Sequence, residues 1–227
     1  MRIAIVGAGG IGCIYGASLA KAGAEVIFIA RGAHLAAMKE NGLRIEGDRG
    51  ETVLDKVQAT DSPAEVGTVD YAIFCVKLWD VESAGAAIRP MVGPETAVIP
   101  QQNGVDAHER LIPILGSDAV MAGTAWVTGS IVAPGVVRQT GTYQRLIYGE
   151  VDGRMSQRGQ ALANLCAEAG FAGEFEPDVL VPIWEKFIGI VPLSSVNALT
   201  RVPLGVYRED PELWALVEGA LNETIAV

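Results

Sequence analysis

The segment VGAGGIGCIYGASLAKAG runs from Val6 to Gly23 and directly follows the apolar stretch Ile3–Val6. Its beginning matches G-x-G-x-x-G, the spacing that binds the phosphates of a dinucleotide when it lies between a strand and a helix. In that role the first glycine allows a tight turn, the second lets the backbone approach a pyrophosphate, and the third lets the helix pack closely. A purely structural glycine turn is the alternative. The candidate cofactor-binding residues are Gly7, Ala8, Gly9, Gly10, Ile11 and Gly12.

The first hundred residues alternate between short apolar runs and helical patterns, which predicts a doubly wound parallel sheet of the Rossmann type. Continuous apolar runs are typical of strands buried on both faces. The predicted strands are Ile3–Val6, Val26–Ala30, Ala72–Val76 and Ala97–Ile99, with helices over Ile11–Ala22 and Ser83–Val92. Two further runs, Leu43–Glu46 and Thr52–Ala59, predict a hairpin at the edge of this sheet.

After Val120 the pattern changes to antiparallel strands and then to helices. We expect strands over Met121–Val127, Gly135–Gln139 and Tyr143–Gly149, and helices over Ser156–Ala169, Asp178–Thr200 and from Asp210 onward. This predicts a nucleotide-binding domain over residues 1–170 and a mainly helical domain over residues 171–227. The last apolar helical pattern reaches Val227 without a capping residue, so we expect the second domain to be incomplete, or truncated.

Composition narrows the classes of partner. The chain has 227 residues, half of them apolar, a formal net charge of −10 and a pI of about 4.7. This acidity argues against nucleic acid or an anionic membrane as partner, and no apolar window is long enough for a membrane span. The three cysteines lie far apart, which favours reduced thiols in a cytoplasmic protein. A nucleophilic Cys13 near a helix N-terminus is the reactive alternative.

The end of the second predicted strand bears on the choice of cofactor. NAD-dependent proteins usually place an acidic residue there to bind the ribose 2′-hydroxyl, whereas this chain has Ala30 followed by Arg31. A guanidinium pairs with a 2′-phosphate through charge-assisted hydrogen bonds. Arg31 therefore favours NADP(H), with a solvated surface arginine as the alternative.

Reduction of a ketone requires a proton donor, and Lys186 is the best candidate. It interrupts a strongly apolar helical pattern, and burial would lower the pKa of its ammonium group toward neutrality. Ser194 and Asn197 follow on the same helical face. The alternatives are a surface lysine at this position and a histidine donor, His34 or His108, although both histidines are expected on solvated helices. No cluster of residues has the spacing of metal ligands, so no metal site is predicted.

Two further polar residues, Lys77 and Asn103, follow predicted strands and so lie at the carboxyl edge of the sheet, where ligands bind in such folds.

Taken together, these residues resemble the ketopantoate reductase (2-dehydropantoate 2-reductase) family along essentially the whole chain. Besides the glycine motif and Ala30-Arg31-Gly32, the resemblance rests on four segments. They are Val76-Lys77-Leu78-Trp79-Asp80, Gln101-Gln102-Asn103-Gly104-Val105, Pro134-Gly135-Val136-Val137-Arg138 and Trp184-Glu185-Lys186-Phe187.

The resemblance implies NADPH-dependent reduction of 2-dehydropantoate to (R)-pantoate, on the route to pantothenate and coenzyme A. It implies that Lys186 donates the proton, that Lys77 lies beside the nicotinamide ribose, and that Asn103 contacts both cofactor and substrate. Substrate-binding residues would be Asn103, Lys186, Ser194 and Asn197. The family usually has asparagines where this chain has Ile190 and Ser194, which leaves the identity of the 2-oxoacid open.

Two other functions remain open at the level of sequence: an opine- or hydroxyacid-dehydrogenase-like enzyme, and a nucleotide-binding module without catalysis. A homodimer is also left open.

Overall fold

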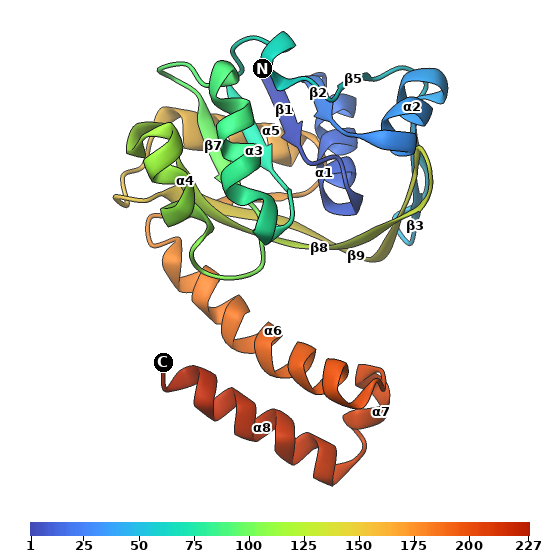
Figure 1. Cartoon of the computed structure of the whole chain (residues 1–227), viewed down its shortest axis with the longest axis vertical. Coiled ribbons are helices and arrows are strands. Elements are labelled where there is room, and N and C mark those ends of the chain that lie inside the picture. The colour runs from blue at the N-terminus through green and yellow to red at the C-terminus, as the bar shows by residue number, and fades with distance from the viewer. The chain divides into compact units, whose positions relative to one another are not determined.

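The computed structural model describes residues 1–227. By its internal contacts the chain divides into a first unit, Met1–Val179, and a second unit, Leu180–Val227 (Figure 1). The division falls beyond the predicted boundary at residue 170, because the strand β10 (Ala172–Phe175) pairs with β9 (Val136–Glu150) of the first unit.

The first unit is built on a five-stranded parallel sheet with the strand order β5-β2-β1-β6-β7. Because the chain leaves β1 toward β2 on one side and returns to β6 on the other, the strand order reverses beside β1. This confirms the predicted doubly wound sheet. The strands are β1 (Arg2–Val6), β2 (Glu25–Ile29), β5 (Gln58–Thr60), β6 (Tyr71–Phe74) and β7 (Ala97–Pro100).

Strand β1 is buried on both faces, which explains its uninterrupted apolar sequence. Ile3 and Ile5 enter one hydrophobic core with helix α1 (Gly10–Lys21), whereas Ala4 and Val6 enter a second core on the opposite face. Helices α3 (Val81–Ile88) and α4 (Ala107–Leu115) cover that second face, as Figure 1 shows.

The other helices of the first unit are α2 (Gly32–Asn41) and α5 (Gln157–Glu168), with short 3₁₀ turns at Pro63–Glu65, Leu78–Asp80, Arg89–Met91 and Ser117–Ala119.

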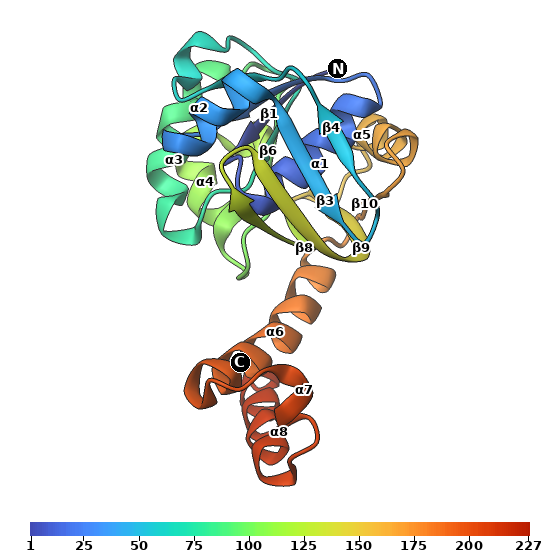
Figure 2. The ribbon, with the colours of Figure 1, turned by 90° about the vertical axis from the view of Figure 1, so that its right-hand side faces the viewer.

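A second sheet lies on the other side of α1, with the order β10-β9-β3-β4 and β8 paired to β9 (Figure 2). Its long hairpin consists of β8 (Met121–Ala133) and β9 (Val136–Glu150). The two segments predicted within β9 form one strand, and the gap between them coincides with a shift of the pairing register beside Val127. This shift is a bulge that leaves residues 141–143 without partners on β8.

The predicted edge hairpin was partly wrong. Strands β3 (Leu43–Gly47) and β4 (Thr52–Leu54) do pair antiparallel, but β3 joins β9 in the second sheet rather than the edge of the parallel sheet. Leu43 and Ile45 are buried in the core around α1, so burial of this apolar face decides the placement. The last residues of the predicted strand Thr52–Ala59 belong instead to β5, which pairs with β2 in the parallel sheet.

The second unit is helical. It contains α6 (Leu180–Thr200), the short α7 (Leu204–Tyr207) and α8 (Pro211–Ile225), with a small core that includes Tyr207 and Val217. The Asp210 carboxylate caps α8 by accepting hydrogen bonds from two backbone N–H groups of its first turn. No helix in either unit combines the length and the apolar composition needed to cross a membrane.

Candidate functional site

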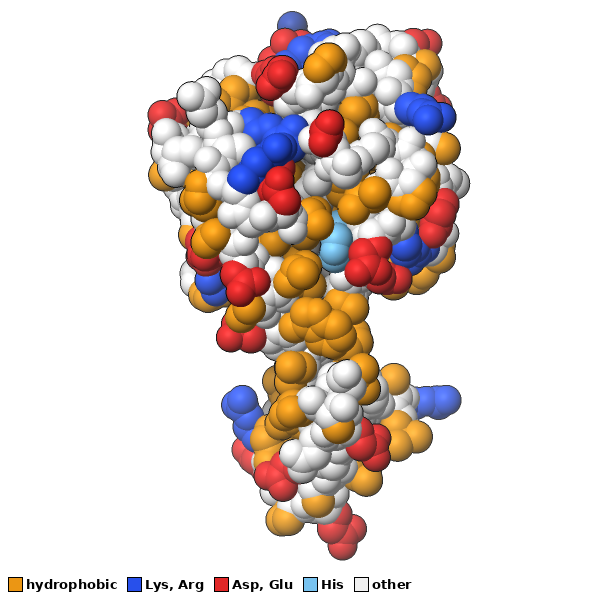
Figure 3. Space-filling view, turned by 90° about the vertical axis from the view of Figure 1, so that its left-hand side faces the viewer, with side chains coloured by type: hydrophobic (Ala, Val, Ile, Leu, Met, Phe, Trp, Pro, Cys, Tyr) orange, Lys and Arg blue, Asp and Glu red, His pale blue; other side chains and the backbone are white.

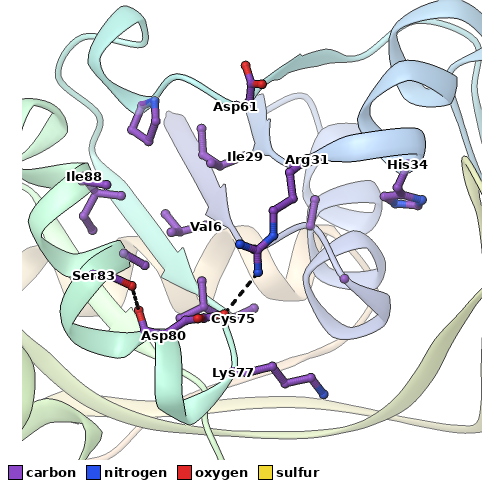
Figure 4. Close-up of a pocket in the computed structure, with 18 of the residues that line it drawn as sticks. Val6, Ile29, Arg31, His34, Asp61, Cys75, Lys77, Asp80, Ser83 and Ile88 are labelled. Atoms are coloured by element: carbon purple, nitrogen blue, oxygen red, sulfur yellow. Dashed lines mark hydrogen bonds and ion pairs between the residues drawn. The ribbon is translucent and has the colours of Figure 1, made fainter.

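A pocket of 460 Å³ lies at the carboxyl ends of β1, β2 and β6, where the strand order of the parallel sheet reverses. Ligands of doubly wound sheets bind in this position. Figure 4 shows Arg31, Lys77 and Asp80 around this pocket, with Val6 and Ile29 at the strand ends. The predicted residues that line it are Gly7, Ala8, Gly9, Arg31 and Lys77.

The first turn of the glycine segment is held tightly against the strands. Gly7 has a φ of 92°, and a Cβ there would lie 2.8 Å from the backbone nitrogen of Val76. The backbone N–H groups of Gly7 and Ala8 both donate hydrogen bonds to the carbonyl oxygen of Ile29. A residue with a side chain at position 7 would meet both strain and collision, so glycine is required there.

Gly9 differs from its neighbours because a Cβ at this position would meet no atom within 4 Å. Its backbone is extended and any residue can adopt it, so neither strain nor packing explains the glycine. The open space lies at the N-terminus of α1, where free N–H groups and the helix dipole favour an anion. These features fit the pyrophosphate of a dinucleotide.

Gly10 and Gly12, by contrast, have packing reasons for being glycine. A Cβ on Gly10 would lie 2.3 Å from the carbonyl oxygen of Gly129 in β8, and one on Gly12 would lie 2.5 Å from that of Gly7. The motif packs α1 between two sheets and leaves one open position, at Gly9. Packing therefore explains Gly10 and Gly12 but not Gly9, and phosphate binding at Gly9 stays a prediction. Binding roles for Gly10, Ile11 and Gly12 through their backbone N–H groups stay predictions.

Arg31 follows β2 and reaches across the pocket. Its side chain is 86% exposed, and its Nη2 donates a hydrogen bond of 3.2 Å to Oδ2 of Asp80. Asp61, which follows β5, lines the same pocket. Neither carboxylate was predicted as a site residue from the sequence around the end of β2. Their signal in the sequence is that each follows a strand of the parallel sheet and so lies at the same edge as Arg31.

Lys77 follows β6 and is exposed at the pocket, whereas Asn103 follows β7, is exposed, and does not line this pocket. Gln102, which was not predicted as a site residue, supports the turn between them. Its Nε2 donates hydrogen bonds of 3.0 Å and 2.9 Å to the carbonyl oxygens of Phe74 and Val76. This amide fixes the end of β6 where the pocket begins.

The remaining predicted residues belong to α6 in the second unit. Lys186 is half-buried, and burial lowers the pKa of its ammonium group to about 8. Ser194 and Asn197 are exposed, and the Asn197 side chain donates a hydrogen bond of 2.8 Å to the carbonyl oxygen of Val202. Lys186 thus has the pKa expected of a proton donor that works near neutral pH.

The histidines were wrongly expected on solvated helix faces. His108 is buried, and His34 accepts a hydrogen bond of 3.1 Å at Nδ1 from the backbone N–H of Gly135. Burial lowers the pKa of both imidazoles, so both favour the neutral form. Cys13 is fully buried, and burial raises the pKa of its thiol well above the usual range. This argues against the alternative of a nucleophilic Cys13.

The charged residues that line the pocket are of both signs, Arg31 and Lys77 with Asp61 and Asp80. On the face of the first unit shown in Figure 3, Lys and Arg side chains likewise lie among Asp and Glu side chains. Such a face offers no continuous basic patch of the kind that follows a nucleic-acid backbone.

Comparison with known proteins agrees with this geometry. Residues 3–153 match the family model described as ketopantoate reductase PanE/ApbA, and residues 178–227 match the model of its C-terminal part. The chain is 34% identical to the 2-dehydropantoate 2-reductase of Mesorhizobium japonicum, over 100% of this chain and 76% of the relative.

Solved structures show the same similarity. The 2-dehydropantoate 2-reductase of Geobacter metallireducens GS-15 superposes with a TM-score of 0.94 at 31% identity, covering 100% of this chain and 74% of that one. The 2-dehydropantoate 2-reductase of Porphyromonas gingivalis W83 gives a TM-score of 0.87 at 31% identity, covering 100% and 89%.

The contrast between Gly9 and Gly12 gives a prediction. Gly9→Ala should keep the free energy of unfolding of the parent protein but weaken dinucleotide binding at least tenfold, because the new methyl group occupies the open space at the helix N-terminus. Gly12→Ala should instead lower that free energy by about 1–3 kcal/mol, because its Cβ collides with backbone. Chemical denaturation and fluorescence titration with NADPH measure the two quantities. Equal effects of both variants on stability would contradict this division of roles.

Proposed function

Because the chain belongs to the ketopantoate reductase family, we propose that it reduces 2-dehydropantoate (ketopantoate) to (R)-pantoate with NADPH, a step toward pantothenate and coenzyme A. The observation that carries the proposal is the agreement between the family matches, which cover both units, and the pocket at the reversal of strand order. Gly9, with open space at the N-terminus of α1, supports a dinucleotide as the ligand of that pocket.

The residues proposed to hold the cofactor come from four strand ends. The backbone N–H groups at the start of α1 would bind the pyrophosphate, Arg31 the 2′-phosphate, and Lys77 the nicotinamide ribose. Asn103, which follows β7 outside this pocket, would contact both cofactor and substrate. When bound, the reduced nicotinamide supplies a hydride to the carbonyl carbon of the 2-oxoacid.

Lys186 is proposed to supply the matching proton to the carbonyl oxygen. As the carbon gains its new C–H bond, negative charge develops on the oxygen, and the ammonium group of Lys186 protonates it to give the hydroxyl. A pKa near 8 keeps most of this group protonated at pH 7 while making proton transfer easier than from an ordinary lysine. Solvent then reprotonates the amine. Ser194 and Asn197 are proposed substrate-binding residues on the same helix.

A closely related 2-oxoacid is the second candidate substrate. The family usually has asparagines at the positions of Ile190 and Ser194, and an isoleucine offers no hydrogen bond to a hydroxyl or carboxylate. A buried group left without its hydrogen-bond partner disfavours a polar substrate strongly.

Steady-state assays with NADPH and a panel of 2-oxoacids test the proposed reaction. We expect ketopantoate to give the highest kcat/KM. Faster turnover of another 2-oxoacid would identify the second candidate, and dinucleotide binding without turnover of any acid would contradict an enzymatic role.

Replacing Lys186 by Ala should lower kcat by a factor of about 10² to 10⁴ and leave NADPH affinity nearly unchanged, because a general acid is lost. In the parent protein, kcat should be highest below the pKa of Lys186 and fall as pH rises through about 8, since only the protonated amine can donate. Lys39→Ala, at an exposed position on α2, is the matched control and should keep full activity. A Lys186→Ala variant with most of its activity, or with the same alkaline limb, would exclude this role.

Arg31→Ala should weaken NADPH binding by about 10- to 100-fold, as expected for a hydrogen bond between charged groups, and leave NADH binding unchanged. Arg44→Ala removes an arginine that is paired with Glu51 outside the pocket and serves as control. Titrations that show equal losses for both dinucleotides would rule out a contact with the 2′-phosphate.

A further inference from the structure

Asp80 lies at the pocket, where the 3₁₀ turn Leu78–Asp80 runs directly into α3. Because the helix continues from this turn, the Asp80 side chain makes no hydrogen bond to the backbone N–H groups at the start of α3. Its Oδ2 instead accepts the hydrogen bond from Nη2 of Arg31, as Figure 4 shows.

This orientation places the Asp80 carboxylate against the guanidinium of Arg31, which is the group proposed to bind a 2′-phosphate. A phosphate bound to Arg31 would share that guanidinium with Asp80, so two anions would lie within a few ångströms of each other. Either they repel while both are bound, or the Arg31–Asp80 pair opens. Both outcomes weaken binding of the phosphorylated cofactor specifically.

A cofactor without the 2′-phosphate has the opposite relationship to Asp80. Its 2′-hydroxyl is a hydrogen-bond donor, and a carboxylate is an acceptor. The Asp61 carboxylate lines the same pocket and adds negative charge, whereas Lys77 and Arg31 supply positive charge. The charges that line this pocket therefore do not all favour a phosphate.

We propose that Asp80 is a specificity-determining residue that reduces the preference of this pocket for NADPH over NADH. The inference rests on the proposed function only in taking a nicotinamide dinucleotide as the ligand of the pocket. Arg31 favours a cofactor with a 2′-phosphate, and Asp80 disfavours it. The parent protein therefore binds both dinucleotides, with a smaller ratio of Kd(NADH) to Kd(NADPH) than Arg31 alone would give.

The test is the ratio Kd(NADH)/Kd(NADPH), measured by fluorescence titration of the whole chain and its Asp80→Asn variant. Asparagine keeps the shape of the side chain and an oxygen that accepts from Arg31, but it removes the charge. We expect the ratio to rise at least fivefold through tighter NADPH binding. An unchanged ratio, within twofold, would overturn the inference, and a lower ratio would show that Asp80 instead positions Arg31.

The matched control is Glu82→Gln, which removes one negative charge two residues further along α3. Glu82 accepts hydrogen bonds from Arg110 and does not line the pocket, so its variant should leave the ratio within twofold of the parent. An equal rise in both variants would attribute the effect to net charge and overturn the inference. Thermal unfolding checks that Asp80→Asn is folded, which is expected because exposed ion pairs contribute little to stability.

The binding ratio does not depend on turnover, so the inference can fail while ketopantoate reduction holds, and the reverse. If neither dinucleotide binds the parent protein, the proposed cofactor fails and the inference fails with it.

Discussion

The close packing of helix α1 between two sheets is the constraint on which the first unit depends. Gly10 lies against the backbone of β8, Gly12 against the turn at Gly7, and a Cβ on Gly16 would lie 2.4 Å from the ring of Phe28 in β2. Protein interiors are packed as densely as organic crystals, so each added methyl group would force the layers apart. This packing holds the N-terminus of α1 at the carboxyl end of β1, where the pocket lies.

The same constraint explains how much of the fold could be predicted from the sequence. The strand, the glycine turn and the helix are adjacent in the chain, and the apolar runs of the parallel sheet are continuous. The role of β9 could not be predicted in the same way, because it pairs in parallel with β3 and β10, far away in the sequence. A hydrophobic pattern shows which face of β3 is buried but not which strand it pairs with.

The site shows the same difference between local and distant information. Arg31 and Lys77 were predicted because each directly follows a strand of the sheet. The Arg31–Asp80 pair joins residues 49 positions apart, and no role in the site was predicted for Asp80 from the sequence. Gln102 likewise donates hydrogen bonds to the carbonyl oxygens of Phe74 and Val76, at the end of the neighbouring strand β6. Such contacts follow from strand order, which a single sequence specifies only indirectly.

The central place of β9 also bears on how the chain acquires its structure during synthesis. The strands of the parallel sheet are complete once residue 100 has left the ribosome, but β3 must wait for β9, and β9 pairs with β10 at residues 172–175. Until then, the apolar face of α1 that the second sheet covers stays exposed to solvent. Pairings between distant segments form slowly because the intervening chain must first be ordered. The nascent chain therefore passes through a stage in which the pocket has its strands but α1 lacks the second sheet that covers it, and apolar surface exposed in this way promotes aggregation and chaperone binding.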